Sequence, residues 1–268
     1  MYPLADRVVL VTGASGGLGK ALCAELLGKG ARVVAADVDE QSLAQLVEEL
    51  GGDRLKTHRL DVTDPQACAR VVEQVIAEWS AIDVLINNAG VTHFSRFDVS
   101  ELEGLRRVID INLLGSINVT QAALPSIIQR RGMVVGLSSV AGFSPLYGRS
   151  AYSASKHGLE GFLSTLRVEL AETGVRVLTV CPAFIQTQPV QRPASAPQGV
   201  ARPGQASATA GRVMMPGEAA AAIVTAMERQ QRRLLLGKVA YFAWFLSRLS
   251  PRLYEWVMVR QTRGEVES

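Results

Sequence analysis

Several protein classes are excluded by what this sequence contains only in small amounts. Cysteine occurs 3 times in 268 residues, at Cys23, Cys68 and Cys181, an odd number at no metal-ligand spacing. A disulfide framework is therefore excluded, and a reducing compartment such as the cytoplasm is expected. The 3 histidines share no metal-ligand spacing either, so we predict no metal site. No secretory signal is recognisable at the start, and no apolar run approaches the ~20 residues of a membrane span.

Net charge is also small. Hydrophobic residues make up 48% of the chain, and the formal net charge is only +3. Intrinsic disorder requires few apolar residues and a large net charge, so it is excluded as the main state. A chain of 268 residues can bury a substantial core by itself. We therefore expect one globular domain.

The basic residues are concentrated at the end of the chain. Residues 229–268 contain eight basic and three acidic side chains, a surplus of +5, whereas the preceding residues carry 20 basic and 22 acidic ones. Because the body has no basic stripe, nucleic-acid binding is disfavoured. The tail also holds six of the aromatic residues, which are Tyr241, Phe242, Trp244, Phe245, Tyr254 and Trp256.

Short apolar runs alternate with helical periodicity along most of the chain. The predicted strands are Val8–Val11, Arg32–Ala36, Leu55–Leu60, Val84–Ile86, Met133–Leu137, Val175–Val180 and Arg233–Leu236. Strands that alternate with helices are typical of a doubly wound parallel sheet of the Rossmann type, here a three-layer α/β/α domain. Ser100 with Glu103 is predicted to cap one helix, and Gly174 to end the helix that starts near Ser150.

One segment interrupts this alternation. Residues 188–216 are rich in Pro, Ala, Gln, Gly and Ser and show no periodicity, which predicts a substrate lid. We assign residues 1–237 to one Rossmann-type domain and residues 238–268 to a basic, aromatic-rich helical extension. Pro251 is expected to divide that extension into two short helices.

A glycine-rich segment joins the first predicted strand to the first predicted helix. Glycines at such a turn allow backbone N–H groups to approach a pyrophosphate at the helix N-terminus. A plain strand–helix turn is the alternative, but the position directly between strand and helix favours a dinucleotide site. The predicted cofactor contacts are Gly13, Ser15, Gly16, Gly17, Leu18 and Gly19.

An acidic residue ends the second predicted strand. Asp37 lies 24 residues after Gly13, near the ~20 expected for a carboxylate that binds the adenosine ribose. A carboxylate would repel the 2′-phosphate of NADP, and none of Ser15, Gly16 and Val38 supplies a compensating positive charge. The sequence therefore predicts NAD rather than NADP as the cofactor.

A tyrosine and a lysine are spaced four residues apart inside a predicted helix, at Tyr152 and Lys156. This spacing places both on one face, where the lysine ammonium would stabilise the phenolate and lower the tyrosine pKa. A tyrosine with a lowered pKa can act as an acid or base near neutral pH. Ser138 and Ser139, at the end of a predicted strand, are placed to supply a hydroxyl to the same pocket.

Together these motifs resemble the short-chain dehydrogenase/reductase family in its compact single-domain form. The resemblance runs from about residue 6 to residue 187, and more loosely to about residue 236. It rests on Thr12–Gly19, Asp61-Val62, Asn87–Gly90, Asn112, Ser139, Tyr152–Lys156 and the segment from Pro182 to Thr187. Several independent motifs in the family's order are far more specific than any single one.

The resemblance implies a role for each matching residue. Tyr152 matches the family's proton donor and acceptor, and Lys156 the residue that lowers the tyrosine pKa and holds the nicotinamide ribose. Ser139 matches the hydroxyl that steadies the substrate oxygen, and Asn112 the residue that supports a proton relay through water behind the lysine. The further cofactor contacts that it implies are Asp61 and Val62 at the adenine, Asn88, Ala89 and Gly90 beside the cofactor, and Ile185 and Thr187 at the nicotinamide carboxamide.

One position departs from the family pattern. Ala183 follows Pro182 where the family usually has glycine. The added methyl group would narrow the backbone approach to the nicotinamide, which bears on the contacts implied for Ile185 and Thr187.

From these residues we predict an NAD-dependent oxidoreductase that interconverts a secondary alcohol and a ketone. The aromatic tail behind the lid predicts a bulky hydrophobic substrate, such as a lipid, a steroid or a retinoid. One alternative is a reductase of 3-oxoacyl thioesters, which Asp37 disfavours because such enzymes are expected to prefer NADPH. Another is a non-catalytic, membrane-peripheral scaffold, which would not need the four catalytic residues.

The tail leaves two interpretations open. Its aromatic residues either pack on the body, as a closing helix or a subunit interface, or enter a lipid headgroup region while the basic surplus meets anionic lipid. We expect a cytoplasmic homo-oligomer, dimer or tetramer, with peripheral membrane contact under the second interpretation.

Overall fold

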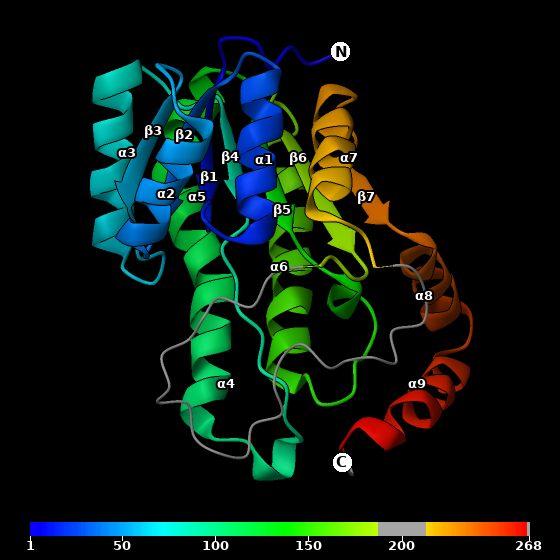
Figure 1. Ribbon diagram of the computed structural model, residues 1–268. Helices are drawn as coiled ribbons and strands as arrows, with labels where there is room; N and C mark the ends of the chain where they lie inside the picture. Colours follow the sequence, from blue (N-terminus) through cyan, green and yellow to red (C-terminus); the bar gives the residue numbers. More distant parts are fainter. Residues whose placement is uncertain (187–212, 267–268) are drawn as a thin grey trace.

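The computed structural model describes residues 1–186 and 213–266. Its centre is one parallel sheet of seven strands in the order β3-β2-β1-β4-β5-β6-β7 (Figure 1). The strands are β1 (Val8–Thr12), β2 (Arg32–Asp37), β3 (Leu55–Arg59), β4 (Val84–Asn87), β5 (Met133–Leu137), β6 (Arg176–Pro182) and β7 (Arg233–Leu236). Every strand predicted from the sequence is present, and the doubly wound Rossmann-type fold is confirmed.

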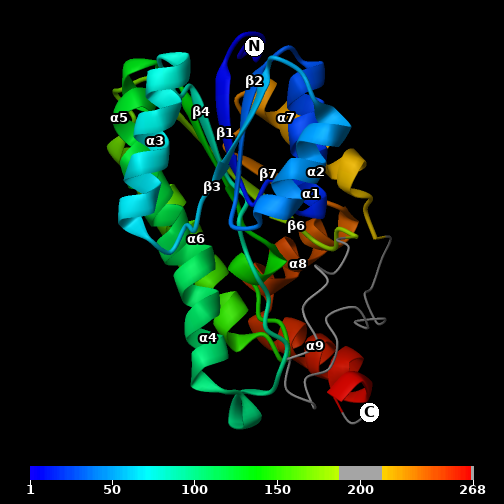
Figure 2. The same ribbon diagram turned by 60° about the vertical axis from the view of Figure 1, so that its left-hand side comes forward.

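Helices cover both faces of this sheet (Figure 2). In chain order they are α1 (Gly17–Gly28), α2 (Glu40–Leu50), α3 (Pro65–Trp79), η1 (Phe97–Val99), α4 (Leu102–Ile109), η2 (Asp110–Leu114), α5 (Gly115–Gln129), η3 (Val140–Gly142), α6 (Ser150–Glu169), α7 (Pro216–Glu228), α8 (Lys238–Leu249) and α9 (Pro251–Val266). Side chains of α1, α2 and α7 share one core cluster with the strands, and those of α3, α5 and α6 share the other. Because both faces are covered, β1, β4 and β5 are apolar and buried along their length.

The direction of winding reverses at the centre of the sheet. β1 pairs with β2 on one side and with β4 on the other, so the connections after β1 and β4 lead to opposite faces. In open α/β sheets this reversal leaves a crevice at the carboxyl ends of the strands, where ligands bind. The glycine-rich segment directly follows β1 and therefore lies at this crevice.

The longest helical stretch runs from Leu102 to Gln129 and consists of α4, η2 and α5. By length and composition alone it could cross a membrane, but 44% of its most apolar window is buried inside the protein. Val119, Ala123 and Ile127 of α5 are fully buried in the core. The stretch is therefore buried in the way that a core helix of the sheet is buried.

The start of α4 differs from the sequence-based expectation. Glu101 is its N-cap, whereas Ser100 follows η1 in an extended conformation. The Ser100 hydroxyl donates a hydrogen bond to the carbonyl of Arg96 (2.6 Å), which ties this side chain to the preceding turn. The predicted Ser100–Glu103 capping box is wrong because α4 begins one residue later than the box requires, with Glu101 as its N-cap, and Ser100 belongs to the preceding turn.

The end of α6 also differs. The helix stops at Glu169, five residues before Gly174, which the sequence predicts as its end. The chain makes a further turn, in which the Thr173 hydroxyl donates to the Leu170 carbonyl (2.8 Å). Gly174 then takes a φ of +82° on the way into β6. Glycine's access to this left-handed region serves the entry to the strand and not the end of the helix.

The C-terminal extension forms two helices at the end of the sheet that carries the glycine-rich loop (Figure 1). Pro251 opens α9, so the extension divides where the sequence predicted. Ala240 and Ala243 of α8 and Tyr254 of α9 are buried, and they pack with Val140 of η3 in a third apolar cluster. One face of the extension therefore packs on the body.

Candidate active site

The glycine-rich loop is shaped by close packing. Gly13 has a φ of +63°, and a Cβ atom there would lie 2.7 Å from the Cα of Ala89. A Cβ atom on Gly19 would lie 2.1 Å from the Gly13 carbonyl oxygen. Among the described residues, no side chain caps α1 at Gly16, and the first turn of α1, which includes Gly17 and Leu18, contains no acidic residue. Its first N–H groups are therefore available to an anion.

Asp37, the last residue of β2, contacts the same loop. Its Oδ2 accepts a hydrogen bond from the backbone N–H of Ser15 (3.1 Å), and its Oδ1 accepts one from the N–H of Asp39 (3.2 Å). The carboxylate thus stands beside the predicted pyrophosphate loop. This is the position from which a carboxylate reaches the adenosine ribose in dinucleotide-binding sheets.

The loops after β1 and β4 are joined by hydrogen bonds. The Thr12 hydroxyl accepts from the backbone N–H groups of Asn88 and Ala89, both at 3.1 Å. The Asn88 side-chain amide donates to the carbonyls of Thr12 (3.0 Å) and Gly13 (2.9 Å). Thr12 is thus a positioning residue whose role its place in the motif did not indicate. Asn88 and Ala89 follow β4 and lie at the crevice, and their contact with the cofactor remains a prediction.

Asp61 and Val62 follow β3 at the rim of the crevice. The exposed Asp61 carboxylate accepts from the N–H (2.9 Å) and the hydroxyl (2.7 Å) of Thr63. Val62 is buried, and a Cβ atom on Gly115 would lie 2.6 Å from its Cγ2. The Asn118 side chain donates to the Val62 carbonyl (3.0 Å). Asp61 is therefore accessible at the rim, whereas the Val62 side chain packs against α5.

Asn112 is fully buried in η2, a π-helical turn between α4 and α5. Its Oδ1 accepts from the N–H of Val91 (2.8 Å), and its amide donates to the Val91 carbonyl (2.9 Å) and the Ser155 hydroxyl (3.1 Å). The Ser155 hydroxyl donates in turn to the carbonyl of Tyr152 (2.8 Å). Such turns often occur at functional sites. Here it connects the loop after β4 to α6.

Lys156 is buried one turn after Tyr152 on α6. Its Nζ donates to the carbonyl of Leu137 at the end of β5 (2.6 Å) and lies 5.7 Å from the centre of the Tyr152 ring. Burial lowers the pKa of Lys156 to about 8. A Cβ atom on Gly90 would lie 3.8 Å from this Nζ and 3.2 Å from the Asn112 Oδ1. The structure thus brings the asparagine and the lysine together beside Gly90, with the tyrosine ring next to the lysine.

The Tyr152 hydroxyl is hydrogen-bonded to Ser139, which follows β5. Burial raises the pKa of Tyr152, and the Ser139 hydrogen bond and the positive charge of Arg149 oppose this rise. The sequence-based expectation gave that effect to Lys156, whose ammonium is instead hydrogen-bonded to a main-chain carbonyl. Ser138, the other candidate hydroxyl, is buried and has no hydrogen-bond partner among the described residues.

Arg149 is a functional candidate that the sequence motifs did not indicate. It is the N-cap residue of α6, and its guanidinium lies 5.9 Å from the centre of the Tyr152 ring and 5.4 Å from that of Phe94. It donates a hydrogen bond to the Thr92 hydroxyl (2.5 Å). Its position three residues before the tyrosine was the available signal, because residues at that spacing share a helix face.

The remaining predicted contacts lie after β6. Ile185 forms an isolated parallel bridge with Met214, beside the crevice end of β6. Thr187 and most of the predicted lid, residues 188–212, lie outside the described residues. Ala183 donates its N–H to the Leu236 carbonyl (3.1 Å), and its methyl group packs against the cluster formed by η3, α8 and α9.

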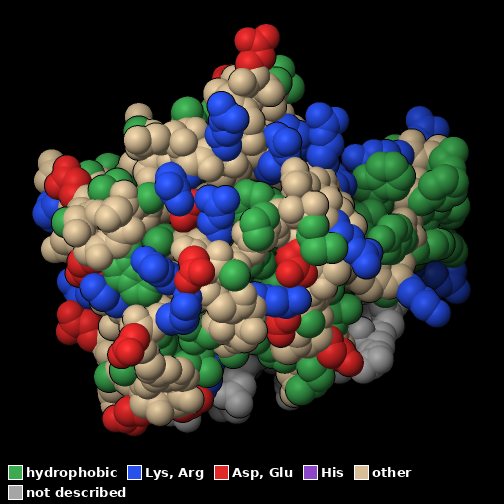
Figure 3. All heavy atoms as spheres, turned by 90° about the horizontal axis from the view of Figure 1, so that it is seen from above, with side chains coloured by type: hydrophobic (Ala, Val, Ile, Leu, Met, Phe, Trp, Pro, Cys, Tyr) green, Lys and Arg blue, Asp and Glu red, His purple; other side chains and the backbone are tan. Residues whose placement is uncertain are grey.

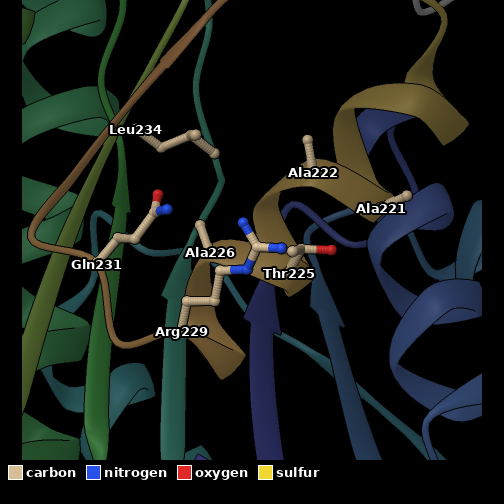
Figure 4. A pocket seen from close by; sticks show the side chains of 7 residues that line it. All are labelled: Ala221, Ala222, Thr225, Ala226, Arg229, Gln231 and Leu234. Atoms are coloured by element: carbon tan, nitrogen blue, oxygen red, sulfur yellow. The ribbon is translucent and has the colours of Figure 1, made fainter. Parts of the chain in front are cut away.

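A separate groove lies between α7 and β7 and has a volume of about 350 Å³ (Figure 4). It is lined by Ala221, Ala222, Thr225, Ala226, Arg229, Gln231 and Leu234. Because none of these residues belongs to the predicted site, the groove is a feature of the sheet edge. Within the described ranges, no cluster of three or more His, Cys, Asp or Glu side chains could hold a metal ion.

The crevice has the two features that a nicotinamide dinucleotide needs. An uncapped helix N-terminus can receive its pyrophosphate, and a half-buried tyrosine with an adjacent hydroxyl can exchange a proton with a substrate oxygen. The residues present therefore fit this cofactor. The sequence profile of the short chain dehydrogenases matches residues 7–197. The chain belongs to the short-chain dehydrogenase/reductase family, whose members bind NAD or NADP.

Curated relatives agree with this assignment. The chain is 40% identical to 3-oxoacyl-(acyl-carrier-protein) reductase FabG of Thermotoga maritima over 187 residues, which cover 69% of this chain and 76% of the relative. It is 33% identical to Dehydrogenase/reductase SDR family member 7B of Xenopus laevis over 276 residues, covering 99% of this chain and 84% of that one.

Solved structures show the same fold. A short-chain dehydrogenase from Streptomyces avermitilis matches 97% of this chain and 99% of its own, with 33% identity and a TM-score of 0.79. A Burkholderia phymatum enzyme in complex with NAD (24% identity, TM-score 0.84) covers 94% of this chain and 96% of its own. A Burkholderia cenocepacia enzyme in complex with NADP (24% identity, TM-score 0.81) covers 96% of this chain and 99% of its own. At this identity the last two establish the fold alone.

Proposed function

We propose that this protein is an NAD-dependent oxidoreductase that interconverts a secondary alcohol and a ketone. The observation that carries the proposal is the half-buried Tyr152, whose hydroxyl is hydrogen-bonded to Ser139. A ketone oxygen at this point would accept hydrogen bonds from both hydroxyls. Tyr152 would donate its proton to that oxygen during reduction and recover it during oxidation. The dinucleotide, when bound, supplies or accepts the hydride.

Lys156 and Asn112 would form the proton relay that serves the tyrosine. With a pKa of about 8, the Lys156 ammonium can lose and regain a proton near neutral pH, as a relay requires. We assign it the second role of holding the nicotinamide ribose. The Asn112 side chain is fixed by three hydrogen bonds, to Val91 and Ser155, so it offers a rigid end to a chain of water molecules.

The preference for NAD over NADP rests on Asp37. Its carboxylate lies beside the loop, where the 2′-phosphate of NADP would meet a like charge. Asp37→Ala should relax the preference and Asp37→Arg should shift it towards NADP, as measured by fluorescence titration with both cofactors. Asp53→Arg, in an exposed turn after α2, is the matched control and should change neither affinity. Equal or tighter binding of NADP by the unmodified protein would refute the assignment.

We assign a bulky hydrophobic substrate of lipid, steroid or retinoid type. Phe94 lies near Tyr152, because the Arg149 guanidinium contacts both rings, and Phe143 follows η3 and packs with the C-terminal extension, so aromatic side chains occur on both segments next to the site. The test is an absorbance screen that follows the nicotinamide with NAD and with NADP over steroid, retinoid, fatty-acyl and small secondary alcohols. Turnover only of small polar alcohols would contradict this substrate class.

A reductase of 3-oxoacyl thioesters is the second candidate function. It is favoured by the 40% identity to the Thermotoga maritima reductase, and Asp37 disfavours it. Oxidation of NADPH with a 3-oxoacyl thioester in the same screen would support it over the first. A non-catalytic scaffold is disfavoured, because a scaffold has no use for a tyrosine, serine, lysine and asparagine held together by hydrogen bonds on neighbouring elements. Binding of the cofactor without turnover of any substrate would favour the scaffold.

The proposed assembly is a homo-oligomer in the cytoplasm. Family members typically oligomerise and act on small molecules, and no nucleic-acid partner is assigned. The alanine-lined groove beside β7 supports a second copy, because small side chains let another backbone approach closely. Sedimentation of the full chain would measure the number of copies.

A further inference from the structure

The C-terminal extension has one covered face and one bare face. On α8, Ala240 and Ala243 are buried against the body, whereas Tyr241, Phe245 and Leu249 are 58%, 61% and 65% exposed. The exposed three are spaced at intervals of four residues, so they form one stripe along the helix. The covered alanines lie on the opposite side of α8.

α9 repeats this division. Tyr254 is buried, while Leu253 and Trp256 are 47% and 57% exposed. Figure 3 shows hydrophobic side chains gathered over the C-terminal helices at the right of the molecule, with Lys and Arg side chains beside them. Single exposed apolar residues are ordinary, but a contiguous group marks an interaction site. The tail surface is defined here as Tyr241, Phe242, Phe245, Leu249, Leu253 and Trp256.

The charges around the tail surface select its partner. Between residues 238 and 260 the exposed charged side chains are Lys238, Arg248, Arg252, Glu255 and Arg260. The Arg260 guanidinium lies 5.2 Å from the centre of the Trp256 ring, so positive charge and aromatic surface are interleaved. A two-fold dimer through this surface would place the same cations of two copies against each other. Anionic lipid headgroups would instead complement them.

We propose that the tail surface lies on an anionic lipid membrane, with its aromatic and aliphatic side chains in the headgroup region and its basic side chains at the lipid phosphates. Tryptophan, tyrosine and phenylalanine suit this region because each presents a large apolar body to the acyl boundary. The docking is independent of the reaction. One consequence rests on the proposed function: α8 packs against η3, directly after Ser139, so an apolar substrate would enter from the lipid side.

Flotation of the full chain with vesicles tests the docking. Vesicles of phosphatidylcholine with phosphatidylglycerol should carry the protein upward at low salt, and high salt should weaken this binding because it screens the charges. Vesicles of phosphatidylcholine alone should carry little of it. A full chain that stays unbound on the phosphatidylglycerol vesicles at low salt overturns the proposal.

Variants separate the apolar and the electrostatic contributions. Phe245→Ser with Trp256→Ser should abolish flotation, and Val168→Ser, a residue of α6 that is 75% exposed, should leave it unchanged. Arg252→Gln with Arg260→Gln should lower the apparent affinity about 25-fold, since each lost charge near an anionic surface lowers it about fivefold. Arg70→Gln, on α3, is the control at an exposed arginine outside the tail surface. Unchanged flotation of the double serine variant would overturn the assignment of this surface.

A second copy as the true occupant gives a different result. In that case the double serine variant would sediment as a smaller species than the wild type without vesicles, and neither protein would float. NAD titration and turnover in detergent-free buffer report the proposed function separately. Intact turnover with no flotation therefore rejects the membrane surface alone, and flotation without turnover rejects the enzyme assignment alone.

Discussion

At the scale of single residues, the acid–base role of Tyr152 gives the most direct prediction. Tyr152→Phe should lower turnover by ~10²–10⁴-fold, because it removes the only proposed proton donor in the pocket. Its affinity for NAD should change little, since the ring remains. Steady-state kinetics and cofactor titration measure the two quantities. Tyr241→Phe, on the exposed stripe of α8, is the control. Near-normal turnover of Tyr152→Phe would show that the proton comes from another group.

Arg149 predicts a shift in the pH profile. In alcohol oxidation Tyr152 must accept a proton, so the rate rises with pH through the tyrosine pKa. The Arg149 charge lowers this pKa, so Arg149→Met should raise it and move the rising limb to higher pH. At a fixed pH below the tyrosine pKa, the oxidation rate should fall about tenfold for each unit by which this pKa rises.

The matched variant for this prediction is Arg149→Lys, which keeps the positive charge. It should restore most of the wild-type profile, whereas a purely structural role through Thr92 would impair both variants equally. The measurement is kcat for oxidation as a function of pH. A profile of Arg149→Met that coincides with the wild type would contradict an electrostatic role for the arginine.

At the scale of elements, an ion pair ties the catalytic helix to the sheet edge. Glu160 lies one turn after Lys156 on α6, and its Oε2 accepts a hydrogen bond from Arg233 of β7 (2.5 Å). Its Oε1 accepts one from the thiol of Cys181 on β6 (3.0 Å), and burial raises the pKa of that thiol. The carboxylate is 10% exposed and the guanidinium 33% exposed, so the pair is largely removed from water.

Breaking this pair should destabilise the protein. Glu160→Gln should lower the free energy of unfolding by about 2 kcal/mol, because it leaves Arg233 without its countercharge in a largely buried position. Glu160→Leu combined with Arg233→Met should recover most of that loss, since no charge is left unpaired. Urea unfolding measures both. Asp98→Asn, in an exposed pair with Arg96, should lower the free energy of unfolding by less than about 0.5 kcal/mol. If it lowered this free energy as much as Glu160→Gln does, the role assigned to burial would be refuted.

Element positions were predictable where the pattern is local. The strands of a sheet covered on both faces are continuous apolar runs, as in Val8–Val11, and such runs mark strands without further information. Helix ends were less predictable. The Ser100 side chain could belong either to the start of α4 or to the preceding turn, and only the fold of η1 decided that it bonds the Arg96 carbonyl.

At the scale of the whole molecule, the two large core clusters contain no residue after Leu236, among those that the structure describes. A chain that stops after Leu236 should therefore still fold. It should melt about 10 °C lower, because burial of Tyr254 and the two alanines of α8 contributes ~3 kcal/mol. A chain that stops after Val259 keeps these residues and should retain the full melting temperature. Thermal unfolding of both is the measurement, and an unchanged melting temperature of the shorter chain would refute the packing of the extension.

Motifs in the sequence indicated candidate residues for the site, but not the contacts that these residues make. Motif positions indicated Asn112, Ser139, Tyr152 and Lys156, and the fold brings these four residues into one pocket. The hydrogen bonds that position these four residues join parts of the chain that are far apart in sequence. The Leu137 carbonyl, 19 residues before Lys156, holds the ammonium, and no local pattern encodes that pairing.

The sequence by itself determined the parallel sheet, the order of its elements and the places where glycine is required. These features follow from periodicity and backbone freedom, which act between residues close together in the chain. Only the tertiary structure decided that Arg149 stands by the tyrosine, that Glu160 pairs with Arg233, and that α8 is covered on one face alone. Such contacts arise when whole elements pack, so their partners are set by the three-dimensional arrangement of surfaces that no single segment of sequence contains.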